Sequence, residues 1–84
     1  MEERYNAIWI SVEEDGSAKM VYENYLVEND KLHIVYVQNN GSYVPYSFIK
    51  KSDSQWRMPI WCKENEKALL PSFEMAKQYF VGFQ

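Results

Sequence analysis

Several residue types on which protein chemistry usually depends are scarce in this chain of 84 residues. It has one cysteine, Cys62, so it cannot form an intramolecular disulfide, and we expect it to work in a reducing compartment. It has one histidine, His33, and one cysteine with one histidine cannot build a tetrahedral zinc site. Its three glycines are isolated, which excludes a P-loop and a dinucleotide-binding fingerprint. We therefore expect neither a metal nor a cofactor.

Long apolar runs and a strong charge of either sign are also lacking. The N-terminal stretch MEERYNAIWISVEEDG begins with acidic residues and has an apolar run of only a few residues. It fits neither a signal peptide nor a membrane-spanning helix, so we expect a cytoplasmic protein with no membrane partner. The net charge of -3 is unlike that of a basic nucleic-acid binder.

Apolar and aromatic residues, in contrast, are plentiful. Hydrophobic residues make up 46% of the chain and aromatic residues 17%. This is enough apolar side chain to form a core without a disulfide or a structural metal, and the length leaves room for one core only. We expect residues 1–84 to form a single small domain.

Turn signals recur about every dozen residues and predict an antiparallel meander. The strongest is Asn40-Gly41, and Asp15-Gly16 is another. Between the turns the segments are rich in β-branched and aromatic residues. Pro45 and Pro59 lack a backbone donor, so we expect the last two strands to lie toward an edge or beside a bulge. The five predicted strands are 5–13, 18–27, 32–38, 43–49 and 55–63.

The hydrophobic period changes after Pro71. In PSFEMAKQYF, the apolar residues Phe73, Ala76 and Phe80 are spaced as on one face of a helix. Ser72 is the predicted N-cap and Gly82 the predicted end. The fold class we expect is α+β, with a five-stranded antiparallel meander sheet or half-barrel and one C-terminal helix.

The predicted strands are apolar on both faces, and a helix of about ten residues covers only part of one face of such a sheet. Two alternatives follow. The sheet curls into a small barrel that hides one face, or the second face meets another molecule, because a large apolar patch is unusual on a monomer.

Candidate catalytic groups are few. His33 lies inside the third predicted strand, where we expect a half-exposed sheet residue. Cys62 and His33 could form a thiolate–imidazolium pair, but the sequence does not place them in contact, and a buried free thiol is the commoner state. We expect the protein not to be an enzyme.

Aromatic and basic residues gather in the fourth and fifth predicted strands. Trp56 and Trp61 are five positions apart, so in a regular strand they lie on opposite faces. Because Trp61 shares a face with Arg57 and Lys63, we expect Trp61 outside and Trp56 in the core. Aromatic residues and arginine dominate protein–protein hot spots. The predicted partner-binding residues are Trp9, Tyr43, Tyr46, Arg57 and Trp61.

Two functions remain open on these residues. The first is a non-enzymatic interaction protein that binds a cellular protein partner through the uncovered sheet face, with a homodimer as a close variant. The alternative is a module for single-stranded nucleic acid or a nucleotide, with Lys50, Lys51 and Arg57 contacting phosphate. Only nucleic-acid binding should weaken steeply with salt.

The last third of the chain carries a resemblance. A tryptophan-containing stretch, SQWRMPIW, is followed by the helix PSFEMAKQYF. This layout resembles the small accessory proteins encoded by bacteriophages, which are often a short antiparallel sheet followed by a helix. The resemblance implies a protein of the host cytoplasm that binds a host component, often to inhibit a defence or regulatory enzyme.

Overall fold

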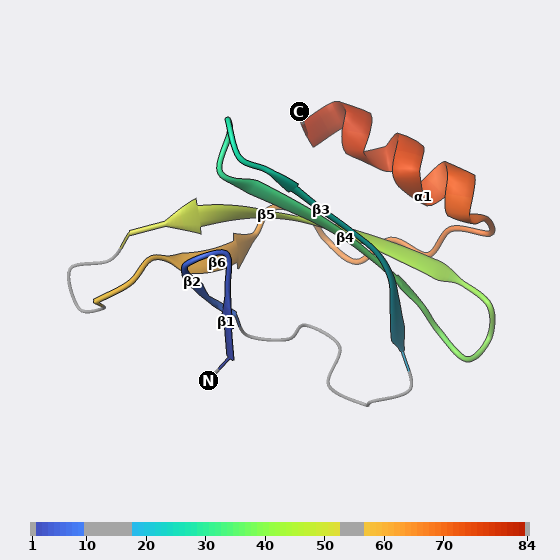
Figure 1. The fold of residues 1–84 in the computed structure, drawn as a ribbon. Helices are drawn as coiled ribbons and strands as arrows, with labels where there is room; N and C mark the ends of the chain where they lie inside the picture. Colours follow the sequence, from blue (N-terminus) through green and yellow to red (C-terminus); the bar gives the residue numbers. More distant parts are fainter. Residues whose placement is uncertain (1, 10–17, 53–56, 84) are drawn as a thin grey trace.

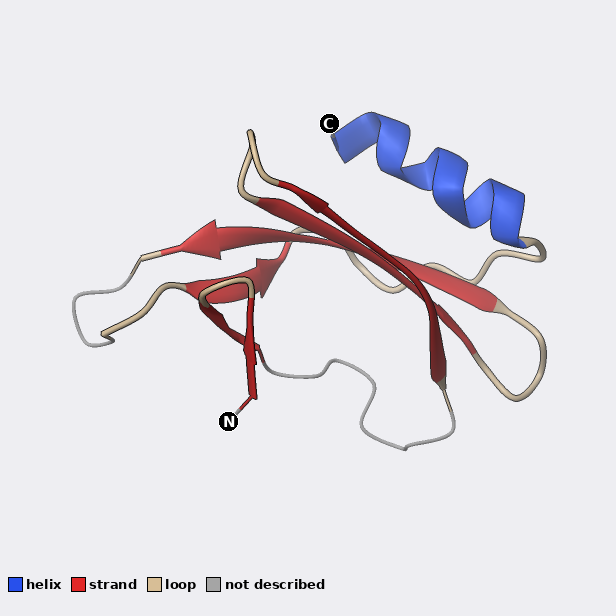
Figure 2. Ribbon diagram, in the orientation of Figure 1, coloured by secondary structure: helices blue, strands red, loops and turns tan. Residues whose placement is uncertain are grey.

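The computed structural model describes residues 2–9, 18–52 and 57–83. In these ranges a six-stranded sheet curls into a half-barrel, and one helix lies against its outer face (Figures 1 and 2). An α+β fold with a curled sheet and a C-terminal helix is thereby confirmed. The elements are β1 (Glu2–Arg4), β2 (Ala7–Trp9), β3 (Lys19–Leu26), β4 (Lys31–Val37), β5 (Tyr43–Lys51), β6 (Ile60–Lys63), the helix α1 (Phe73–Tyr79) and the 3-10 helix η1 (Phe80–Phe83).

The strand order is β1-β2-β6-β5-β4-β3, and β2 runs parallel to β6 while the other neighbours are antiparallel. The prediction of five strands, all antiparallel, is therefore wrong in number and in one pairing. The additional strand, β1, precedes the first predicted strand (5–13), and a turn at the start of that predicted strand joins it to β2. Tyr5 and Asn6 both have positive φ angles, 50° and 63°, as in a two-residue hairpin, and the chain folds back on itself there. The remainder of that predicted strand, 10–13, and the Asp15-Gly16 turn lie outside the described residues.

The inner face of the sheet carries the larger core. Curling brings β2 and β6 beneath β4 and β5, so the inner side chains of one sheet pack against each other (Figure 1). The Trp9 and Phe48 rings, for example, meet edge to face with centroids 4.8 Å apart. Of the two alternatives for the apolar sheet, the curled one is observed. The buried residues of this core are Ala7, Trp9, Leu32, Ile34, Tyr36, Val44, Tyr46, Phe48 and Trp61.

The outer face is covered by α1 and η1. Ala76 and Phe80 are buried with Val35 of β4, as the helical spacing predicts. The predicted N-cap is confirmed, because the Ser72 hydroxyl accepts a hydrogen bond from the Met75 backbone N–H at 3.2 Å. The predicted end at Gly82 is wrong. The α-helix ends at Tyr79 and the chain tightens into a 3-10 turn that contains the glycine.

The Asn40-Gly41 turn is confirmed after β4, whereas the expected edge position of the two proline-containing strands is wrong, because β5 and β6 are the two central strands of the sheet. Gly41 has a φ of 87°, and its N–H donates to the Gln38 carbonyl at 2.9 Å, so the chain reverses at Asn40-Gly41. Pro45 lies in the central strand β5, but β6 pairs with β5 only from Phe48 onward. Beyond that point the Asn65 side chain takes the place of a strand, donating to the Pro45 carbonyl at 3.0 Å. Pro45 therefore sits at a local edge. No helix in the described ranges is long and apolar enough to span a bilayer.

Candidate functional site

The aromatic residues predicted to bind a partner lie mostly in the core. Trp61 is only 5% exposed, and Trp9 and Tyr46 are buried beside it. The prediction that Trp61 faces outward is wrong. It assumed a strand that runs through Arg57, but β6 begins at Ile60, so the alternation counted from Arg57 does not hold. Trp56, its expected inner counterpart, lies outside the described residues.

The other two members of that set do not complete a surface. Tyr43 is half-buried on the outer face, where its ring lies 6.0 Å from the Phe73 ring of α1. Arg57 is exposed in the bend that precedes β6. The five residues are therefore divided among two cores and a loop, because in the described ranges the inner face is buried within the half-barrel and α1 and η1 pack on the outer face.

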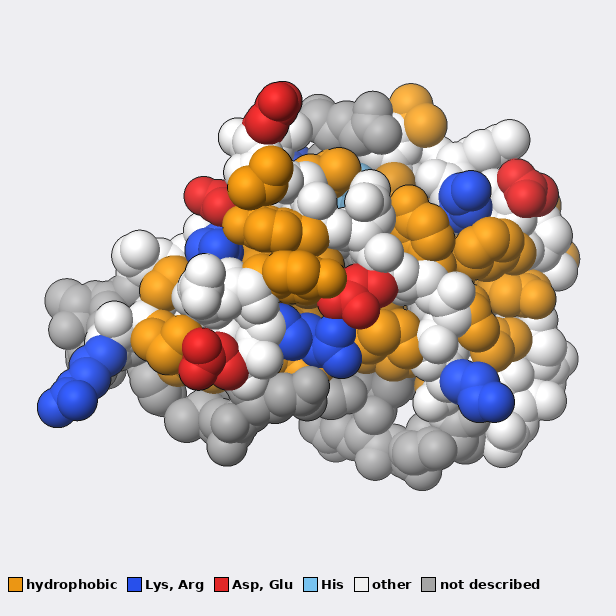
Figure 3. All heavy atoms as spheres, in the orientation of Figure 1, with side chains coloured by type: hydrophobic (Ala, Val, Ile, Leu, Met, Phe, Trp, Pro, Cys, Tyr) orange, Lys and Arg blue, Asp and Glu red, His pale blue; other side chains and the backbone are white. Residues whose placement is uncertain are grey.

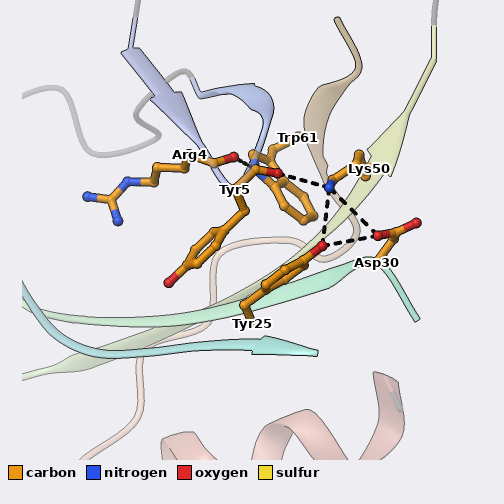
Figure 4. Close-up of polar contacts among 6 residues, drawn as sticks. All are labelled: Arg4, Tyr5, Tyr25, Asp30, Lys50 and Trp61. Atoms are coloured by element: carbon orange, nitrogen blue, oxygen red, sulfur yellow. Dashed lines mark hydrogen bonds and ion pairs between the residues drawn. The ribbon is translucent and has the colours of Figure 1, made fainter. Parts of the chain in front are cut away.

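A different group of residues closes the half-barrel. The outermost strands, β1 and β3, face each other across its opening, and side chains bridge them. Arg4 Nη1 lies 2.7 Å from Glu23 Oε2, and the rings of Tyr5 and Tyr25 stack with centroids 4.5 Å apart. We name these four residues the seam. Figure 4 shows the Tyr5 ring beside the Tyr25 ring, with the Arg4 side chain extending away from both.

Lys50 is bonded to residues on both sides of the seam. Its Nζ donates to the Tyr5 carbonyl oxygen at 2.9 Å and to the Tyr25 hydroxyl at 3.2 Å, and it lies 3.7 Å from the Asp30 carboxylate (Figure 4). The ammonium is also 5.2 Å from the ring centroids of both Tyr25 and Trp61. Its side chain is only 14% exposed. Of the three cations predicted to contact phosphate, Lys50 is thus held inside the protein, while Lys51 and Arg57 are exposed.

Trp61, a residue of the inner core, is bonded to the β1–β2 hairpin. Its indole Nε1 donates to the Arg4 carbonyl oxygen at 2.9 Å, so side chains of both β5 and β6 are bonded to the tip of the β1–β2 hairpin (Figure 4). A buried indole N–H normally needs such a partner. Side-chain bonds therefore contribute much of what fixes the hairpin, since within the described ranges one ladder pair, Ile8 with Ile60, joins β2 to β6.

Tyr5 is the unusual residue of the seam. A bulky residue with a positive φ angle costs on the order of 1–3 kcal/mol and persists only where its surroundings enforce it. Here the ring stack on Tyr25 and the bond from Lys50 to the Tyr5 carbonyl enforce it. Hydrogen bonding to the Glu23 carboxylate raises the pKa of the Tyr5 phenol. The side chain is nevertheless 40% exposed.

Sequence reasoning missed the seam. The one local signal is Asn6, a residue type that tolerates the left-handed conformation, but it stands within a run that otherwise reads as a strand. Tyr25 and Asp30 gave no signal of their own, because their roles depend on a hairpin that approaches from a distant part of the sequence.

A polar cluster on the outer face contains a serine, a histidine and a carboxylate. The Ser47 hydroxyl donates to Glu64 at 2.6 Å, and Glu64 also pairs with Lys31 at 3.4 Å. His33 is opposite Ser47 in the ladder, but its ring stacks on Phe80 and is only 2% exposed. Because Ser47 is fully buried and bonds to the acid, the cluster presents no nucleophile to solvent. His33 is buried and not half-exposed as predicted, since η1 covers it.

Cys62 and His33, the two candidate catalytic residues, have different contact partners. The Cys62 thiol lies 3.9 Å from the Ile60 carbonyl, and no contact in the described part of the chain joins it to His33. Within the same ranges, no three histidine, cysteine, aspartate or glutamate side chains are close enough to hold a metal ion. No family model, curated protein or solved structure matches this chain.

The buried His33 predicts a pH dependence of stability. Burial lowers the pKa of His33, Lys31 lowers it further and Glu64 opposes them. The folded state then binds this proton less readily than the unfolded chain, so the stabilisation is complete above the unfolded pKa and is lost as the pH falls. We expect the free energy of unfolding, measured in urea, to decrease between about pH 7 and about pH 5. His33→Phe keeps a ring against Phe80 and removes the titration, so an unchanged pH dependence in that variant would contradict this account.

Proposed function

We propose that this chain is a non-enzymatic interaction protein that binds a protein partner at the seam, with Tyr5 as its aromatic anchor. The observation that carries the proposal is the conformation of Tyr5. A large ring is held at the tip of a two-residue turn, in a backbone conformation that asparagine or glycine would adopt at lower cost, and it is partly exposed there. Strained residues of this kind concentrate at functional sites.

The surroundings of Tyr5 suit a protein interface. Tyrosine and arginine are enriched among hot-spot residues, and such residues are usually ringed by polar groups that exclude water. Around Tyr5 the polar groups are Arg4 and Glu23, with the Asp30 carboxylate on the far side of Tyr25. Val27, which is 67% exposed, extends the apolar part of this surface. The resemblance to phage accessory proteins directs the search for the partner to host proteins, including defence and regulatory enzymes.

Nucleic-acid binding is the alternative, supported by the exposed Lys51 and Arg57 at the two ends of the β5–β6 connection. Lys50 no longer supports this alternative as a phosphate-binding residue, because its ammonium group is already bonded to Tyr5 and lies near the Asp30 carboxylate. On the face shown in Figure 3, charges of both signs are interspersed with hydrophobic side chains. A basic footprint is the usual mark of nucleic-acid binders, so we place a protein partner first.

Replacing Tyr5 with asparagine tests the proposal without disturbing the turn. Asparagine favours the left-handed conformation, so Tyr5→Asn removes the ring and retains the hairpin. Tagged protein is incubated with lysate of the source cell, and bound material is quantified by mass spectrometry. We expect one protein to be enriched by the wild type and about tenfold less by Tyr5→Asn, the loss that follows from one modest hot spot.

Met75→Asn is the matched control, because Met75 is similarly exposed but lies on α1, on the outer face of the sheet. It should capture the partner as well as the wild type does. Equal capture by all three proteins would refute a binding site at the seam. A wild-type dimer in light scattering that becomes a monomer in Tyr5→Asn would identify the partner as a second copy, whereas capture of nucleic acid that falls steeply with salt would favour the alternative.

A further inference from the structure

A hollow lies beside the seam, where β3 turns into β4. It has a volume of about 270 Å³ and is lined by the end of β3 and the turn, namely Tyr25, Leu26, Val27, Glu28 and Asn29. Two bonds fix its shape. The Asn29 N–H donates to the Leu26 carbonyl at 3.1 Å, and the Tyr25 hydroxyl donates to Asp30 at 3.2 Å. The hollow is therefore part of the ordered hairpin, and it shares Tyr25 with the seam.

The hollow is lined by both apolar and acidic residues. Leu26 and Val27 are the apolar ones, and Val27 is the more exposed. Glu28 also lines the hollow, is exposed, and pairs with no cation within the described ranges. Asp30, in contrast, is already compensated by Lys50. Glu28 is thus the carboxylate available to a ligand.

We infer that this hollow binds a lysine or arginine side chain of the protein partner. The aliphatic stem of such a side chain packs on Leu26 and Val27, and its cationic head meets the Glu28 carboxylate, since long basic side chains bury their stems while their charge stays at the rim. The volume suits one side chain, because sites for drug-sized ligands begin at about 300 Å³. The inference rests on the proposed function and adds that the partner presents a basic side chain at the interface.

The test uses two small probes of closely similar size and shape, one cationic and one neutral. Nα-acetyl-arginine methylamide and its uncharged citrulline counterpart are titrated into the ¹⁵N-labelled full chain, and amide chemical shifts are followed. We expect saturable shifts at residues 25–29 with the arginine probe, with a Kd on the order of millimolar for so small a ligand. The citrulline probe should produce none that saturate.

Two charge-neutralising variants complete the test. Glu28→Gln should weaken binding of the arginine probe about three- to fivefold, as for an exposed ion pair. Glu74→Gln, which neutralises an exposed acid on α1, should leave it unchanged. Equal binding of both probes, saturable shifts elsewhere than at 25–29, no saturable shifts at all, or an unaffected Glu28→Gln would overturn the inference.

This experiment is independent of the test of the proposed function, because it needs no partner. Partner capture that depends on Tyr5 would leave the proposed function standing even if the arginine probe does not bind. Conversely, capture that is indifferent to Tyr5 would refute the seam as the interface, whatever the probe shows.

Discussion

Replacing Lys50 with methionine lowers the free energy of unfolding by about 3 kcal/mol, because the variant keeps the aliphatic stem but loses the charge-assisted hydrogen bonds and two cation–π contacts. The atoms left without a donor, the Tyr5 carbonyl and the Tyr25 hydroxyl, belong to the two sides of the seam. We therefore expect the amides of β1 and β2 to lose protection from hydrogen exchange before the rest of the sheet does.

Lys51→Met is the control for this substitution. Lys51 follows Lys50 in β5 but is exposed, so its replacement should change the unfolding free energy by less than about 0.5 kcal/mol. Urea denaturation of the two variants measures the difference. If they are equally stable, then Lys50 does not hold the hairpin and the described closure of the half-barrel has another cause.

Trp61→Ala should be the most damaging single change. Removal of a buried tryptophan side chain costs about 3–5 kcal/mol, and a domain of this size has only about 5–10 kcal/mol in total. The variant also leaves the Arg4 carbonyl without its indole donor. We expect it to lose about half of its unfolding free energy and to unfold at a much lower temperature than the wild type, as measured by circular dichroism.

Trp61→Phe separates packing from hydrogen bonding at the same site. A phenyl ring fills most of the space but cannot donate to Arg4, so we expect a smaller loss of about 1–2 kcal/mol. A Trp61→Ala protein as stable as the wild type would show instead that the indole lies outside, as the sequence pattern had suggested.

The parts of the fold that the sequence predicts well depend on local patterns. The strands β3, β4 and β5 agree within a few residues with the predicted segments 18–27, 32–38 and 43–49, because apolar alternation and turn residues define them within a short window. The N-cap at Ser72 is equally local. These predictions do not depend on which distant segments of the chain pair with each other.

The candidate site could not be predicted from the sequence, because it depends on contacts between distant segments. Whether Trp61 points inward depends on where β6 begins, and the tyrosine at position 5 reads as a strand residue until the hairpin is seen. A shift of a strand by one residue exchanges its two faces, so small errors in the bounds of a strand become large errors in the choice of surface residues. Arg57 and Trp61 were assigned to one face for this reason.

The parallel pairing of β2 with β6 has a consequence for how the chain folds. It joins Ile8 to Ile60, more than fifty positions apart, whereas β3, β4 and β5 are joined by short connections. Contacts between residues far apart in the sequence form late, because bringing them together costs the conformational entropy of the long segment between them before the contact contributes any stability. During synthesis the first two strands leave the ribosome before the strand they join has been made. We therefore expect the three-stranded meander to form first and the N-terminal hairpin to dock last.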